Sequence, residues 1–295
     1  MLNAPVAPTY PSGKPSHPVS ADARAAALVF LRQLAAELSS GTVNLPCFPD
    51  VVLRIRKALA DPKNTPARTV SIVGAEPRLA ARLMQSANSA AFNPTGKTVT
   101  DLRHAITRLG HQIVQSSAMA FAVQHMKDEA SLRSIAEPLS ALWRKSITVA
   151  LLCQIVAGRT RITPDEAFLT GLLHGIGRLY IMVRAIGKTD EFKDPEAFID
   201  LVSGWQATIG KSVLENWGFA PPMCEALADQ ADYERPRQPD ADLSDVLIVS
   251  IALCEGHPMG GIAAFETIGL SDQDCADIMA QAARQLDSLQ SALGG

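Results

Sequence analysis

The spacing of apolar side chains constrains this chain more than any other feature. From Ser20 onward apolar residues recur three and four positions apart, the period of a helix, and alternation typical of a strand is nowhere sustained. Leu79, Leu83 and Ala87, for example, form one stripe after Pro77. With 295 residues and 47% hydrophobic side chains, the chain is long enough to bury a substantial core. The pattern predicts an all-α protein in which helices pack on helices in two adjoining clusters.

Composition divides the chain into three segments. Residues 1–19 contain five prolines among small and polar residues and are predicted to be a disordered tail. Residues 20–127 are expected to form an N-terminal helical subdomain, and residues 128–295 a second helical subdomain. The polar stretch KDEASLRS, which begins at Lys127, is the predicted boundary between them.

Several helix ends can be predicted from capping residues. Thr100 is expected to cap a helix that ends at Gly110. Thr163-Pro164-Asp165-Glu166 has the pattern of a capping box with proline at the first helical position. Further helices are predicted near Pro195–Trp217 and Asp242–Glu255.

Charge, cysteine content and hydropathy exclude several classes of protein. The 27 basic and 30 acidic residues give a net charge of -3, so no broad basic field suggests direct nucleic-acid binding. The longest apolar runs, Ile147–Ala157 and Val246–Cys254, are shorter than the ~20 residues of a membrane helix. No signal or transit peptide is recognisable at the N-terminus, so a cytoplasmic protein without a membrane partner is expected. The five cysteines include no Cys-x-x-Cys pair and are interpreted as reduced, packed thiols.

Two sets of segments resemble a known family. LPCFPDVVLRIRKAL, SIVGAEPRLAARLMQSANSAAF and VTDLRHAITRLGHQIV closely resemble the N-terminal half of the HDOD (HD-related output domain) family. ALWRKSITVALLCQIVA, AFLTGLLHGIGRLYI and SVLENWGFAPPMCEAL are similar to its C-terminal half. The resemblance covers nearly everything from Leu45 to about Glu255. It implies a bacterial helical regulatory module that works beside signalling domains and lacks the hydrolase activity of related HD proteins.

The resemblance also allows a test for catalysis. Active HD proteins hold divalent metal with an early His, a His-Asp pair and a late Asp, because a metal that activates water needs about three protein ligands. Here the pair corresponds to His174-Gly175, the early His to Lys145 and the late Asp to Leu253. Glu255 lies two residues further on, about 200° around the helix, and is not expected to substitute.

Other positions of the same site also lack metal ligands. The additional histidines of two-metal relatives fall near Gln206 and Gln230. His174 is therefore expected to be a partly buried histidine bonded to a backbone carbonyl. Gly171, Gly175 and Gly177 are expected to permit close helix approach or a bend. We expect no metal, no cofactor and no catalytic residue.

A small-molecule site remains a possibility at the same place. Lys145, Arg178 and Arg144 flank the remnant HD site, where cations could replace the charge of the lost metal. The alternative is that these side chains are simply solvated. A sensor that binds a nucleotide in the remnant cavity is therefore one candidate function.

Protein contacts are the interpretation that the sequence favours. Arg78, Arg82 and Asn88 form a candidate interface, although Asn88 is more readily explained as an internal cap or cross-link between helices. The chain is predicted to be a non-catalytic signalling module whose partner is a kinase, a response regulator or a cyclic-nucleotide enzyme. A metal-dependent phosphohydrolase or cyclic-dinucleotide phosphodiesterase is the alternative from the enzyme class.

Overall fold

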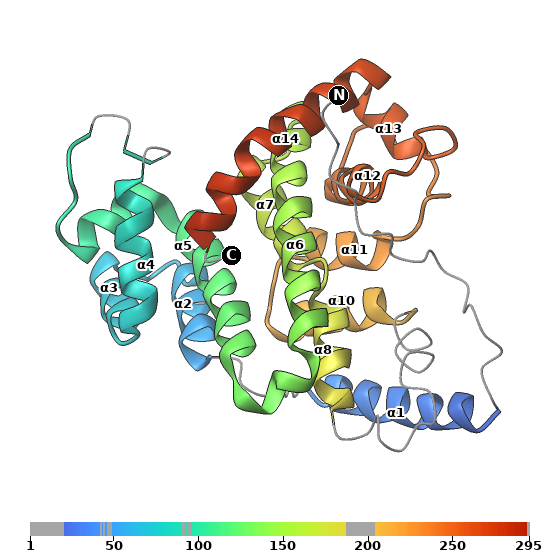
Figure 1. The fold of residues 1–295 in the computed structure, drawn as a ribbon, viewed down its shortest axis with the longest axis horizontal. Helices are drawn as coiled ribbons and strands as arrows, with labels where there is room; N and C mark the ends of the chain where they lie inside the picture. Colours follow the sequence, from blue (N-terminus) through green and yellow to red (C-terminus); the bar gives the residue numbers. More distant parts are fainter. Residues whose placement is uncertain are drawn as a thin grey trace.

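The computed structural model describes residues 21–186 and 204–293, apart from residues 42, 44, 46–48, 90–91 and 94–95. The predicted tail at residues 1–19 lies outside this part. Throughout the described ranges every regular element is helical, so the predicted all-α class is confirmed (Figure 1). The elements are α1 (Ala21–Ser39), α2 (Asp50–Ala60), α3 (Pro66–Gly74), α4 (Pro77–Asn88), α5 (Leu102–Asp128), η1 (Ala130–Ile135), α6 (Ala136–Ala157), α7 (Pro164–Leu173), α8 (Ile176–Ala185), α10 (Gln206–Asn216), α11 (Pro221–Asp229), α12 (Leu243–Glu255), α13 (Ala263–Ile268) and α14 (Asp272–Leu293).

Helices α2 to α5 form one group, at the left of Figure 1. The apolar stripe of α4 is buried against α5, with Leu79 and Leu83 both fully inaccessible. Gly110 has φ 76° and ψ 168°, values that interrupt the helical path of α5 without ending it. Because a β-carbon disfavours positive φ, glycine is the residue suited to this bend.

Helix α6 is the central helix of the second group. It packs against α7, α12 and α14, and it approaches α7 closely because Gly171 has no side chain. A β-carbon added at Gly171 would lie 2.7 Å from the α-carbon of Ala150. The stretch Ala130–Ala157 is long and apolar enough to span a membrane by composition, yet 56% of its most apolar window is buried within the fold. Its packing is that of a core helix.

Helix α1 packs with the second group rather than with its neighbours in sequence, as Figure 1 shows at the bottom of the view. Glu37 pairs with Arg184 and accepts a hydrogen bond of 3.3 Å from the Tyr180 hydroxyl. The Asn216 amide donates to the Leu38 carbonyl at 3.1 Å. This differs from the predicted division, which grouped α1 with residues 20–127, because spacing within a helix does not show which distant helix covers its apolar face.

Two predicted helix starts need correction. Asp101, not Thr100, caps α5, and its carboxylate accepts a hydrogen bond of 3.0 Å from the His104 N–H. Thr163 precedes α7, but its side chain makes no capping bond, so the predicted capping box is wrong. The stretch KDEASLRS coincides with the end of α5 at Asp128, and η1 follows with Leu132 buried. A division into subdomains at this point stays a prediction.

Helices α8 and α13 were not predicted as separate elements. A third predicted helix lies only partly within the described residues. Helix α8 begins directly after a break at Gly175, and α13 was not predicted. Of the predicted helix Pro195–Trp217, residues 195–203 lie outside the described residues, and α10 accounts for the rest. Cys153, Cys224, Cys254 and Cys275 are unbridged, as expected of reduced thiols.

Candidate functional site

An ion pair lies at the remnant HD site, the place that corresponds to the metal ligands of HD proteins. Lys145 on α6 faces the C-terminal end of α12, and its ammonium group pairs with the Glu255 carboxylate. The two side chains are only 21% and 27% exposed. Glu255 thus reaches this site from α12, as the partner of Lys145, and that it does not substitute for the late Asp as a metal ligand stays a prediction. A helical-wheel angle gives the direction of the β-carbon, whereas a long carboxylate side chain at the end of a helix can extend toward a cation on the facing helix.

Glu255 has two further partners that the sequence did not indicate. His257 places Nε2 3.1 Å from Glu255 Oε2, and the Tyr233 hydroxyl donates to the same oxygen at 3.4 Å. The rings of Tyr233 and His257 are 5.2 Å apart. Both residues lie in loops, where apolar periodicity carries no signal. Both side chains border the Glu255 carboxylate at the end of α12.

These contacts determine the ionisation of Glu255. Burial alone would raise the pKa of its carboxyl, but the hydrogen bond and charge of Lys145, helped by His257, hold that pKa below its usual value. Burial and the nearby Glu255 charge raise the pKa of the Tyr233 hydroxyl. The site therefore contains an ionised carboxylate already paired with an internal cation.

His174 is buried next to this ion pair. The side chain is held at the end of α7, and its Nδ1 lies 2.7 Å from the Gly171 carbonyl oxygen. Burial, and secondly the charge of Lys145, lower the pKa of His174 to about 4. A carbonyl oxygen only accepts hydrogen bonds, so Nδ1 carries the proton of a neutral imidazole. The expected backbone-bonded histidine is confirmed.

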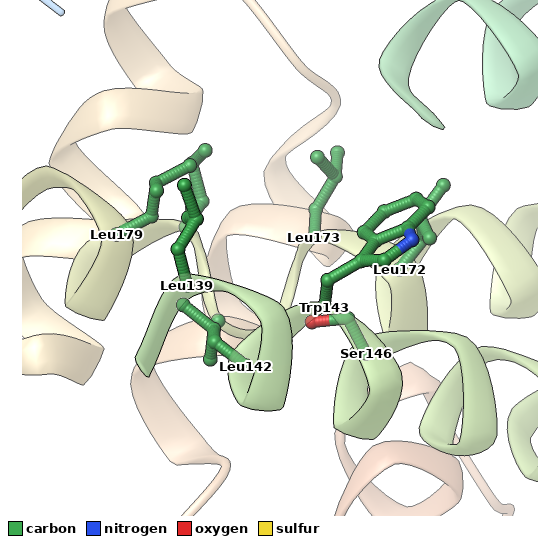
Figure 2. Close-up of a pocket in the computed structure, with 9 residues that line it drawn as sticks. Leu139, Leu142, Trp143, Ser146, Leu172, Leu173 and Leu179 are labelled. Atoms are coloured by element: carbon green, nitrogen blue, oxygen red, sulfur yellow. The ribbon is translucent and has the colours of Figure 1, made fainter. Parts of the chain in front are cut away.

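Gly175 borders a small apolar cavity beside His174. Figure 2 shows Leu139, Leu142 and Leu179 along one side of it, with Trp143 and the other labelled leucines opposite. The cavity measures about 20 Å³, which is room for roughly one water molecule. A nucleotide does not fit in this space as it stands.

The other predicted site residues have structural contacts. Leu253 is partly buried against the core, and the Gln230 amide donates to the Leu227 carbonyl at 2.8 Å. Gln206 begins α10, and its carbonyl oxygen would lie 1.9 Å from a β-carbon added at Gly177. The expected close approach at Gly177 is thus confirmed. Among the described residues, no hydrogen bond orients Gln206 or Gln230 toward a metal site.

The residues present do not fit the metal that the HD fold would hold. Lys145 presents a cation where the first ligand would stand, and Gly175 has no side chain to coordinate. Over the described part of the chain, no three His, Cys, Asp or Glu side chains come together as ligands would. The described residues therefore do not provide the ligand set of a metal-dependent reaction.

The predicted anion-binding residues are close in sequence but differ in environment. Lys145 is paired with Glu255, Arg144 is exposed on α6, and Arg178 is partly buried on α8. The charge of Lys145 is thus largely balanced from within the protein. Recognition of an anion by these three residues stays a prediction.

At the candidate interface, Asn88 acts as a cross-link between α4 and the segment before α5. Its side-chain amide donates to the carbonyls of Met84, at 3.0 Å, and Val99, at 2.9 Å, while Oδ1 accepts from the Val99 N–H at 2.7 Å. The structural role expected for Asn88 is confirmed. Arg78 is exposed and Arg82 partly buried on the same helix.

Comparison with known proteins agrees with this geometry. The profile of the HDOD domain matches residues 45–233. An uncharacterized protein of Treponema pallidum (strain Nichols) is 21% identical over 209 residues, which are 66% of this chain and only 39% of that protein.

Three solved structures share the fold. A protein of Shewanella amazonensis SB2B, named provisionally as a metal-dependent phosphohydrolase, is 24% identical with a TM-score of 0.67, over 91% of this chain and 99% of that one. A signal transduction protein of Marinobacter aquaeolei VT8, also provisionally named, is 20% identical with a TM-score of 0.62, over 91% and 66%. An HDOD domain protein of Geobacter sulfurreducens is 22% identical with a TM-score of 0.59, over 88% and 96%. At these identities the likeness concerns the fold alone.

Proposed function

Because the chain belongs to the HDOD domain family, we propose that it is a non-catalytic signalling module that acts in the cytoplasm through contacts with a protein partner. The observation that carries this proposal is the Lys145–Glu255 ion pair. It places a cation, neutralised by its own carboxylate, where HD enzymes need metal ligands.

Electrostatics opposes metal binding at this place. The Lys145 ammonium repels a divalent ion, and the Glu255 carboxylate that could attract one is already paired with Lys145. Metal binding through Glu255 would also require this carboxylate to break its ion pair with Lys145. His174 offers a single neutral nitrogen, and one ligand does not hold a metal.

The proposed partners are signalling proteins such as a kinase, a response regulator or a cyclic-nucleotide enzyme. Support comes from the family and from the name of the Marinobacter aquaeolei protein, which shares the fold. The exposed outer face of α4, which carries Arg78, is available for such a contact because the opposite face is buried against α5.

Metal content combined with a hydrolysis assay tests the non-catalytic proposal. Protein purified without chelators or a His-tag is analysed by plasma mass spectrometry, and then assayed on bis(p-nitrophenyl) phosphate and cyclic dinucleotides with added Mn²⁺, Fe²⁺ or Mg²⁺. We expect substoichiometric metal and no hydrolysis above a protein-free blank. The matched control is His174→Asn, which removes the one ligand that survives and should behave like the wild type.

A positive result would identify the alternative, a metal-dependent phosphohydrolase of the kind named for the Shewanella amazonensis protein. Near-integral metal in the wild type, together with hydrolysis that is lost in His174→Asn, would overturn the proposal. Hydrolysis that persists in His174→Asn would indicate a contaminating enzyme, and the proposal would stand.

A further inference from the structure

A buried arginine on α2 lies against the turn between α10 and α11. The Arg56 residue is 8% exposed, and one terminal nitrogen of its guanidinium donates to the Gly218 carbonyl. Its guanidinium carbon lies 4.2 Å from the centroid of the Phe219 ring. A carbonyl dipole and an aromatic face stabilise a cation, but neither carries the negative charge that would neutralise it.

Arg56 is not matched by a carboxylate. Along the described ranges of the chain no Asp or Glu pairs with it, and its Nε has no hydrogen-bond partner. Burial lowers the pKa of the guanidinium, as expected for a cation removed from water. Buried charges in proteins are normally paired, because an isolated buried ion is costly.

Two other partly buried arginines have carboxylate partners. Arg235, with a side chain 16% exposed, contacts the carboxylates of Asp229, Asp242 and Asp245. Arg184 pairs with Glu37. Arg108, which is also partly buried, donates to the backbone carbonyls of Ala87 and Lys97, so Arg56 is distinguished by its deeper burial without a carboxylate.

Arg56 also lines a cavity between α2 and the end of α10. This cavity measures about 180 Å³, against about 20 Å³ for the one beside Gly175. Besides Arg56 it is lined by Gly41, Val43, Leu53, Lys57, Asn216 and Trp217. Lys57 adds a second cation, so the lining contains two positive charges and no negative one.

We propose that this cavity binds a small molecule through a phosphate group, with Arg56 as the buried counterion and Lys57 at the solvent-exposed edge. Two cations facing one cavity favour a doubly charged oxyanion over a singly charged carboxylate. The volume of this partly open cavity, about 180 Å³, suits a phosphate group with a small organic remainder.

Such a ligand would connect two parts of the chain that are far apart in sequence. The lining comes from the segment after α1, from α2 and from the end of α10. An anion bound between them would hold α2 against the α10–α11 turn. Such a ligand would act on the module as a small-molecule signal, in addition to the proposed contact with a protein partner.

Isothermal titration calorimetry with inorganic phosphate tests the proposal, with potassium acetate and potassium chloride at matched ionic strength as the other arms. We expect saturable binding of phosphate and none of chloride. Lys57→Ala should weaken phosphate binding about tenfold, the loss of roughly one charge-assisted contact worth about 1.4 kcal/mol. The matched control is Lys63→Ala, an exposed lysine in the loop after α2 that does not line the cavity.

Arg56→Gln should abolish binding, and circular dichroism reports whether that variant folds. If it does not fold, the comparison of Lys57→Ala with Lys63→Ala still decides the matter. The proposal is overturned if phosphate shows no saturable heat, or if both lysine variants lose affinity equally. Acetate binding as tight as phosphate binding would overturn the preference for a doubly charged group.

Discussion

The protonation of His174 makes the stability of this protein depend on pH in a way that can be calculated. In the folded state burial and the charge of Lys145 lower the pKa of His174 to about 4, from its ordinary value of 6.5. Between these two values the unfolded chain binds a proton at His174 and the folded chain does not. Stability therefore falls as the pH falls through this window.

The magnitude follows from the two pKa values. At pH 7.5 the two states differ little in proton binding, whereas at pH 5.0 the unfolded state is favoured by about 2 kcal/mol through this one group. The full effect, reached near pH 4, is about 3 kcal/mol. This is a large share of the ~5–15 kcal/mol by which domains are usually stable.

Urea unfolding of the wild type and of His174→Asn at pH 7.5, 6.5, 5.5 and 5.0 isolates the contribution of His174. Asparagine can still donate a hydrogen bond to the Gly171 carbonyl but does not titrate. We expect the stability advantage of the wild type over the variant to shrink by about 2 kcal/mol between pH 7.5 and 5.0. His111→Gln, at an exposed histidine, is the matched control substitution.

A difference between wild type and His174→Asn that stays constant with pH would refute this reasoning. It would mean that the imidazole is protonated in the folded state, with Lys145 displaced or water admitted. An NMR titration of the His174 ring that gave an ordinary pKa would lead to the same conclusion.

Three further substitutions test the packing. Asn88→Ala removes two hydrogen bonds between α4 and the segment before α5 and a third within α4, and should lower the free energy of unfolding by about 2–3 kcal/mol, more than it lowers partner binding per folded molecule. Gly177→Ala places a β-carbon inside the backbone of α10 and should cost about 3 kcal/mol or more in urea unfolding, whereas Gly260→Ala, with open space around it, should change stability by less than about 0.5 kcal/mol. Arg235→Gln leaves the buried Asp245 carboxylate poorly paired and should cost about 3 kcal/mol at pH 7. Because burial raises the pKa of that carboxyl, the loss should shrink as the pH falls.

Local signals allowed most of the fold to be predicted. Proline marks the start of α3 and of α4, and Gly110 marks the bend inside α5, so these features could be predicted from local residues. The break between α7 and α8 was harder, because apolar residues continue through it from Leu169 to Val183. Buried helices lack an amphipathic pattern, so their ends are poorly marked.

The sequence indicated which residues belong to the candidate site, but it did not indicate their contacts. The motif identified Lys145 on α6, and His174 and Gly175 in the turn between α7 and α8. The contacts of Glu255 with Lys145, and those of Tyr233 and His257 with Glu255, depend on how two loops return to α6. Arg56 was overlooked for a similar reason: its partners are on a turn 162 residues away in sequence.

The packing of α1 has a consequence for synthesis of the chain on the ribosome. Glu37 meets a partner 147 residues later, and Leu38 meets one 178 residues later. At roughly 5–20 residues per second, α1 leaves the exit tunnel about 10–40 s before its binding surface exists. During that interval Phe30 and Leu34, which become buried in the finished protein, have no folded surface to cover them. Slowing translation between α1 and α10 should therefore lengthen the time in which a nascent-chain chaperone or a protease can act on this helix.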